Sequence, residues 1–178
     1  MTPAPITLPL HYARRLTPDM APEGIWGAGN TALLEAPLLA LLASRASSGS
    51  ALLDVLELVP EWVRAGRVLV SGFHSPLEQQ VLHSVLRRKG RVVRVLARGM
   101  GSTWRPRPEE REPLSEGRML LLTACPPKVS RTTRATALAR NRLVLALASE
   151  VCAPCVAEGS PLATLLQEMG ISGACAGA

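Results

Sequence analysis

The sequence predicts a single α/β domain with three layers, in which helices cover both faces of a doubly wound, mostly parallel sheet. Its 178 residues suit one domain of ordinary size. Short apolar runs have the length of strands that are buried on both faces, and amphipathic helical segments separate most of these runs. Hydrophobic residues make up 47% of the chain and charged residues only 19%, so a disordered chain is excluded.

Five apolar runs are the predicted strands, and we expect about five or six mostly parallel strands in all. The runs are residues 37–44, 67–72, 91–99, 118–124 and 151–158. Between the third and fourth of them, residues 101–117 contain three prolines and show no periodicity, so we expect a surface loop there.

The chain before the first strand, residues 1–36, is rich in Pro and Gly and is expected to form an extended arm. We therefore divide the chain into this arm and a domain over residues 37–178. Within the arm, GAGNTA at residues 27–32 fits the glycine fingerprint of dinucleotide sites. No predicted strand precedes it and no long helix follows it, so we interpret it as a turn before a short helix.

Four helices are predicted, and the second has the clearest start. Ser75 is its expected N-cap, Pro76 fills the first helical position, and Glu78 completes a capping box. Its apolar stripe consists of Leu77, Val81, Leu82, Val85 and Leu86. The third helix is expected over residues 131–150, and the fourth starts at Ser160.

The first helix is expected over residues 49–64. Leu52, Leu56, Val59 and Val63 fall on one face of it at spacings of three and four residues. This face is predicted to pack on the sheet.

A ligand is expected at the carboxyl edge of the sheet, where strands end and helices begin. Arg45, Arg98, Arg131 and Arg134 all fall at such junctions, and the chain carries a formal net charge of +6. These cations, together with free N–H groups at the start of the helix after Ser75, would suit a phosphate. The alternative is that each arginine is merely solvated.

Three other residues near these junctions need an explanation. At Gly72 we expect either a positive φ or the close approach of a ligand, with a purely architectural turn as the alternative. His74 follows it and is a candidate ligand contact. Asn141 lies in mid-helix, where Asn has poor propensity, so its side chain is expected to contact either the ligand or a neighbouring loop backbone.

Cysteine and aromatic usage narrows the function classes. Four cysteines are too few and too scattered for a secreted disulfide scaffold. Cys152 and Cys155 have metal-like spacing but no second ligand pair, so we interpret them as buried thiols and predict neither a metal nor a cofactor. Aromatic residues are only 3% of the chain, which argues against a binding face built on a stacking platform. Without a signal peptide or a membrane-spanning run, a cytoplasmic protein with no membrane partner is expected.

A series of segments between Gly29 and Gly170 resembles the DNA-processing protein A family (DprA, also called Smf). The segments are GN…LL…P, a strand ending in Ser-Arg, SGFHSPLEQ, VVRVLARGM, ARNRLVLALA and EGSPLAT. The resemblance implies a Rossmann-like domain that binds single-stranded DNA. In bacteria that take up DNA, such a protein protects the incoming strand and helps to load the RecA recombinase.

The family's functional turns are carried over to this sequence with departures. Its Gly-Ser/Thr-Arg turn falls on residues 43–45, where Ala43 replaces the glycine, and its last Ser-Gly turn is reversed. The glycine-rich segment after the second strand is replaced by residues 73–78. The predicted nucleic-acid or phosphate site is Ser44, Arg45, Ser71, Gly72, Phe73, His74, Arg98, Arg134, Arg140, Asn141, Gly159 and Ser160.

No catalytic residue is predicted, and the expected function is DprA-like binding of single-stranded DNA in DNA uptake or recombination. The alternative is a nucleotide-binding sensor, or an enzyme similar to the related lysine-decarboxylase-like phosphoribohydrolases, in which Glu168 would take the place of the family's glutamate. The expected partners are single-stranded DNA or a nucleotide, a RecA-type recombinase, and a second copy of the chain in a homodimer.

Overall fold

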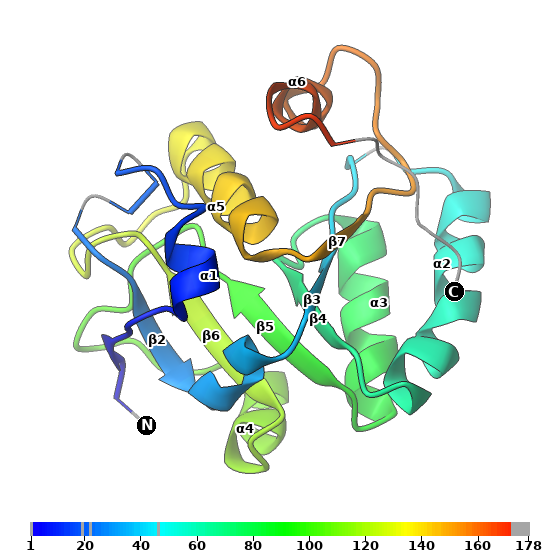
Figure 1. Ribbon diagram of the computed structural model, residues 1–178. Coiled ribbons are helices and arrows are strands. Elements are labelled where there is room, and N and C mark those ends of the chain that lie inside the picture. Colours follow the sequence, from blue (N-terminus) through cyan, green and yellow to red (C-terminus); the bar gives the residue numbers. More distant parts are fainter. Residues whose placement is uncertain (1, 19, 22, 46, 172–178) are drawn as a thin grey trace.

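The computed structural model describes residues 2–18, 20–21, 23–45 and 47–171 and contains one twisted sheet between two helical layers (Figure 1). The strands are β1 (Ala4–Pro5), β2 (Trp26–Gly29), β3 (Leu38–Leu41), β4 (Val68–Ser71), β5 (Arg91–Val95), β6 (Met119–Thr123) and β7 (Glu150–Cys152). The helices are α1 (Leu10–Ala13), the 3-10 helix η1 (Thr31–Glu35), α2 (Gly49–Arg64), α3 (Pro76–Arg87), α4 (Pro108–Ser115), α5 (Arg134–Leu147) and α6 (Pro161–Glu168).

The sheet has the order β1-β2-β6-β5-β4-β3-β7. Strands β7, β3, β4, β5 and β6 run parallel, whereas β2 pairs antiparallel with β6 and β1 pairs antiparallel with β2. The chain moves outward from β3 to β6 on one side and then returns to add β7 on the other. The predicted doubly wound, mostly parallel α/β fold is therefore confirmed, and the described part of the chain contributes seven strands where five or six were expected.

Side chains alternate along the strands between two separate apolar clusters, as the pleat of a strand requires. Leu38 and Ala40 of β3 belong to the cluster that contains α5, whereas Leu39 and Leu41 belong to the cluster under α2 and α3. Both faces of the central sheet are buried, because helices cover each of them (Figure 1). This is why the central strands have no polar face and read as continuous apolar runs.

The starts of α3 and α6 follow the predicted signals, whereas the third predicted helix, residues 131–150, is shorter in the structure and forms α5 (Arg134–Leu147). Ser75 caps α3 in a full capping box with Glu78, and Ser160 caps α6 by accepting a bond from the Ala163 N–H. Helix α2 also has the predicted bounds, but its most buried residues are Val55, Val59 and Trp62. The other predicted stripe residues, Leu52, Leu56 and Val63, are partly buried beside them.

Two expectations about the irregular segments are wrong. The segment before residue 37 does not lie outside the sheet, because Trp26–Gly29 forms β2 and the fully buried Tyr12 donates a hydrogen bond from its hydroxyl to the Ala36 carbonyl (3.0 Å). The loop over residues 101–117 contains helix α4, which starts with Pro108 at a position that tolerates proline. The GAGNTA stretch ends β2 and leads into η1, so it forms a strand end and a short helix.

Cys152 at the end of β7 is buried and disulfide-bonded, so the predicted thiol is wrong at this position. In the described ranges, His, Cys, Asp and Glu side chains do not gather into a metal-binding group. None of the helices in this part of the chain has the length and apolar character that a membrane span requires.

A substitution at Leu120 tests how much the buried central strands contribute to the free energy of unfolding. Leu120 is fully buried in β6, so Leu120→Ala is expected to lower the free energy of unfolding by about 2–5 kcal/mol, through lost burial and the cavity left behind. Leu53 on α2 is 62% exposed and is the matched control, for which Leu53→Ala should change little. Urea denaturation measures both, and equal stabilities of the two variants would contradict this account of the core.

Candidate functional site

A cleft of about 370 Å³ lies at the carboxyl edge of the sheet, between the ends of β4 and β5 and helix α5. We call it the basic cleft. It is lined by Arg45, Gly72, His74, Pro76, Arg94, Val95, Leu96, Ala97, Arg98, Arg107, Thr132, Ala137 and Arg140. Its lining contains five arginines and no Asp or Glu, so an anion would meet attraction from several sides.

The cleft is held in shape by the fully buried carboxylate of Glu78 on α3. Its Oε1 accepts a hydrogen bond from the Ala43 N–H (3.0 Å), just after β3. Its Oε2 accepts from the N–H groups of His74 (2.8 Å) and Ser75 (3.4 Å). One side chain therefore joins the end of β3 to the turn between β4 and α3, which brings Arg45 and His74 to the same cleft.

These bonds also set the protonation of Glu78. Burial by itself would raise the pKa of the carboxyl, but the hydrogen bond from the His74 side chain and those from the backbone N–H groups of His74 and Ala43 outweigh burial and lower the pKa below its usual value. The carboxylate is therefore ionised at neutral pH. At the start of α3 itself, Pro76 has no N–H and the Glu78 N–H donates to Ser75 Oγ (3.3 Å), so neither position offers a free N–H to a phosphate.

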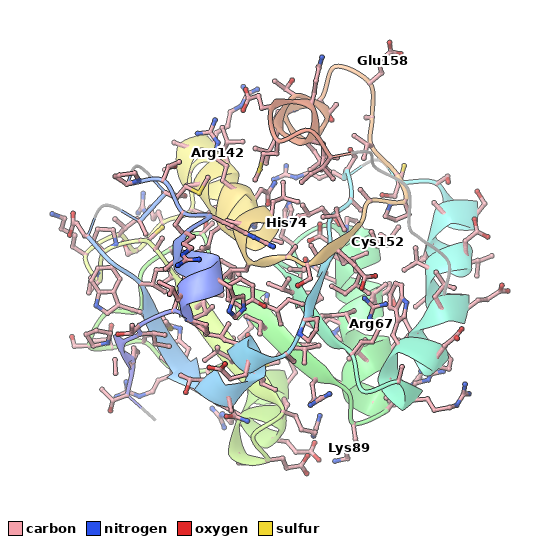
Figure 2. The ribbon with its side chains drawn as sticks, viewed as in Figure 1. Arg67, His74, Lys89, Arg142, Cys152 and Glu158 are labelled. Carbon is pink, nitrogen blue, oxygen red and sulfur yellow. The ribbon has the colours of Figure 1, made fainter. Side chains whose placement is uncertain are left out.

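His74, which is labelled in Figure 2, links this carboxylate to Arg140 on α5. Its Nδ1 lies 3.0 Å from Glu78 Oε2, and its Nε2 lies 3.3 Å from Arg140 Nη2. Because a guanidinium can only donate, Nε2 accepts and the Nδ1–H donates to the carboxylate. A line of hydrogen bonds thus runs from α5 through the imidazole to the buried acid.

Arg140 is a buried cation without a carboxylate of its own. Its residue is 6% exposed, and its guanidinium donates to Asn141 Oδ1 from Nε (3.0 Å) and Nη2 (2.9 Å). Within the described residues no carboxylate pairs with it. Burial lowers the pKa of Arg140, and the charges of Arg94 and Arg45 lower it further against the opposing effect of Glu78. A group in this position favours an anionic ligand.

Arg94 is the second buried cation of the cleft. Its Nη1 donates to Glu110 Oε1 at 2.8 Å, and both side chains are about nine-tenths buried or more. Glu110 Oε2 accepts from the Arg107 N–H at 2.8 Å, so this ion pair fixes the start of α4 against β5. Among the residues that the structure describes, none accepts a hydrogen bond from the Nε of Arg94.

The predicted site residues divide among three places. Arg45, Gly72, His74, Arg98 and Arg140 line the basic cleft, as expected from their junction positions. Arg134 and Gly159 instead line a separate cleft of about 280 Å³ between α5 and α6, where Ser160 is the N-cap of α6.

The remaining predicted residues have structural roles. Ser71 and Phe73 are fully buried, and Ser71 Oγ accepts from the Phe73 N–H (3.0 Å), so neither side chain faces the cleft. Ser44 Oγ accepts from the Ala157 N–H (2.9 Å) and ties two loops together. Asn141 binds the Arg140 guanidinium, a role that neither of its expected alternatives describes.

The role expected for Gly72 needs correction. The positive φ at this turn belongs to Phe73 (48°), while Gly72 is absent from the positive-φ positions of the described chain. A Cβ at Gly72 would lie 2.6 Å from Arg140 Nε and 2.7 Å from its Cζ. Glycine is therefore present because the Arg140 side chain crosses directly over it.

Sequence reasoning missed Arg94, Arg107 and Thr132 as lining residues. Arg94 lies within a strand, where an arginine reads only as an interruption of an apolar run. Arg107 comes to the cleft through α4, which was not predicted. The sequence did contain a signal for Arg94. Charged residues are rarely buried unless they are paired, so an arginine inside a buried strand predicts an acidic partner or an anionic ligand.

Gly72→Ala tests the packing of Arg140. The new methyl group should displace the guanidinium and lower the free energy of unfolding by about 1–3 kcal/mol. Gly49→Ala is the matched control, because nothing lies within 4 Å of a Cβ there and alanine favours the helix. Thermal or urea denaturation checks both; in an Arg140→Ala background the cost of Gly72→Ala should largely vanish. An unchanged cost in that background would contradict the contact.

Glu78→Gln tests the buried carboxylate. It should lower the free energy of unfolding at neutral pH by about 1–3 kcal/mol, because amide hydrogens then face N–H donors. Because the folded-state pKa is lowered, the stabilisation is complete above the unfolded value of about 4.5 and is lost as pH falls through the folded value. The parent should therefore lose stability below about pH 4.5 more steeply than the variant. Glu57→Gln, at an exposed position on α2, should keep the parent's pH profile.

Comparisons with known proteins agree with this architecture. The family model for DNA recombination-mediator protein A matches residues 9–158. The structure is similar to DNA processing protein A from Streptococcus pneumoniae, with a TM-score of 0.72 and 22% identity, over 96% of this chain and 60% of that chain. It is also similar to the Helicobacter pylori protein, with a TM-score of 0.74 and 20% identity, over 94% of this chain and 77% of that one.

The chain thus spans about three fifths of the length of the pneumococcal protein. A comparison with curated protein sequences finds no match. Because the family model covers residues 9–158, with the strands from β2 to β7 among them, the chain belongs to the DNA recombination-mediator protein A family.

Proposed function

We propose that the basic cleft binds the phosphate backbone of single-stranded DNA and that the protein acts as a binder without a catalytic step. The observation that carries the proposal is Arg140, a buried residue that lines the cleft and has no carboxylate partner in the described residues. A phosphodiester oxygen would supply the missing anionic acceptor.

The rim of the cleft supports a chain-like ligand over a small one. Arg45, Arg98 and Arg107 are exposed and come from three different loops, so they can contact successive phosphates, while Arg94 and Arg140 are buried. Guanidinium groups bind phosphate oxygens in pairs, which fixes the path of a backbone without reading its bases. The binding is therefore expected to tolerate sequence changes in the DNA.

Membership in the family also suggests the cellular process in which the protein acts and the partners that it binds. The structure of the Helicobacter pylori relative is described as having a single-stranded DNA binding mode. By analogy we place this chain in DNA uptake and recombination, with a RecA-type recombinase and a second copy of the chain as partners. These partners rest on the family alone.

A nucleotide sensor or a phosphoribohydrolase is the competing function. The enzyme would need Glu168 at the ligand, but Glu168 lines the separate cleft between α5 and α6 and pairs with Arg142 at 3.3 Å. A thermal-shift panel separates the alternatives, since a ligand that binds only the folded chain raises its melting temperature. A shift with an oligonucleotide of about 20 residues, and none with mononucleotides, is the result that favours DNA.

Arg45→Ala tests phosphate binding directly. Each lost phosphate contact should reduce the log–log slope of affinity against salt by about 0.7 for a single strand, and affinity at low salt should fall. Arg87→Ala is the matched control, because Arg87 is exposed in the last turn of α3 and lines no described cleft. Fluorescence anisotropy with labelled DNA over a salt series measures both. If Arg45→Ala binds with the parent's affinity and slope, the assignment of the basic cleft fails.

A further inference from the structure

We infer that a bound single strand continues from the basic cleft along a second groove and stacks one base on Trp26 of β2, the strand next to the end of the sheet. This inference rests on the proposed function and adds residues that the family motifs do not include. It is carried by the continuity of three clefts, by their charge, and by the placement of Trp26.

The three clefts share lining residues and therefore lie next to one another in a row. Arg98 lines both the basic cleft and a neighbouring cleft of about 340 Å³. That neighbour shares Gly101, Arg105 and Pro127 with a third cleft of about 550 Å³, which reaches Trp26. We call the second and third clefts together the edge groove. Trp26 of β2 lines the far end of this groove. In Figure 1, β2 lies at the opposite end of the sheet from β7 and α2.

The edge groove continues the electrostatic character of the basic cleft. No Asp or Glu lines any of the three clefts, whereas Arg98 stands at the junction of the first two and Arg105 at the junction of the last two. Arg105 is exposed, and its Nη1 donates to the carbonyls of Ser102 (3.2 Å) and Trp104 (2.7 Å). These bonds hold the guanidinium over the loop and leave Nε and Nη2 for a phosphate.

Trp26 reaches this edge because β2 runs against its neighbour. It is the first residue of β2 and pairs with Thr123, the last residue of β6, so it lies level with the carboxyl ends of the parallel strands. It is only partly buried, whereas Trp62 (4% exposed) and Trp104 (9%) are in the core. Trp104 also lines the second cleft, but it is buried, so Trp26 is the tryptophan whose ring offers the more accessible surface to a ligand.

An indole at the end of a basic path has a specific use with nucleic acid. Every base has a π-face, so one ring can hold a base of any sequence while arginines follow the backbone. A single ring does not make the aromatic platform that the composition argues against, but it can anchor one nucleotide. The groove thus predicts that longer strands bind more tightly than strands that fill only the basic cleft.

The experiment compares two variants on two DNA lengths. Oligothymidylates of about 3 and about 15 nucleotides are titrated against the parent, Trp26→Leu and Arg105→Ala, with Arg87→Ala as the control. The parent should bind the longer strand more tightly. Trp26→Leu should lose about tenfold of that affinity, the size expected for one stacked base, and Arg105→Ala a smaller factor. Both should bind the short strand as the parent does, which also shows that the basic cleft is folded.

Fluorescence supplies a readout that does not depend on a variant. The longer strand should quench tryptophan emission of the parent, and Trp26→Phe should remove the quenching while keeping most of the affinity. Equal affinity of the parent and both variants for the longer strand, without quenching, overturns the edge groove and leaves the basic cleft intact. If the parent binds neither strand, the proposed function itself fails.

Discussion

The candidate site depends on one interaction, the burial of the Glu78 carboxylate among donors from neighbouring segments. An ionised carboxylate out of water is stable only when its oxygens are fully hydrogen-bonded. Here the donors are the N–H groups of Ala43, His74 and Ser75 and the imidazole Nδ1–H of His74. These donors come from the segment after β3 and from the turn between β4 and α3. The hydrogen bonds to this one carboxylate therefore fix how the ends of β3 and β4 lie beside each other.

The same carboxylate reaches a third element through His74. The imidazole accepts from Arg140, so helix α5 is connected to the strand ends by a polar contact and also by the apolar packing of its inner face. A comparable arrangement exists on the other side of the cleft, where Glu110 accepts both from Arg94 of β5 and from the backbone at the start of α4. Each acid is buried and bound internally, which leaves only cations at the cleft surface.

Much of the fold could be predicted because its signals are local. The apolar runs of β3 to β6 and the Ser75 capping box depend only on neighbouring residues, and they give the layers and the carboxyl edge. β2 was missed because Trp26–Gly29 contains two glycines and is held by pairing with a strand almost a hundred residues away. α4 was missed because its two prolines predict a loop. Its first turn is held in place by the ion pair between Glu110 and Arg94 of β5, which the local sequence does not reveal.

The site could be predicted only in part, for the same reason. Arg45, Gly72, His74, Arg98 and Arg140 were found because they follow strands or fall on family motifs. The sequence does not reveal which way a turn faces, so Ser71 and Phe73 were included although both are buried. The reason for a glycine at position 72 could not be predicted either. The side chain of Arg140, which is distant in the sequence, crosses over Gly72 and leaves no room for a Cβ.

Burial of Arg140 connects stability to binding. Water has already been removed from this guanidinium when the chain folds, and the bonds to Asn141 and His74 hold its orientation. In an exposed site, an arginine loses both its hydration and its side-chain freedom only when the ligand arrives, and both losses weaken binding. In the basic cleft, Arg140 loses its hydration and its side-chain freedom when the chain folds, before any ligand binds. Gly72 leaves room for the Arg140 side chain, and Glu78 orients it through His74. A phosphate that enters meets a fixed, poorly hydrated charge, so the contact with Arg140 should be stronger than contacts with the exposed arginines of the rim.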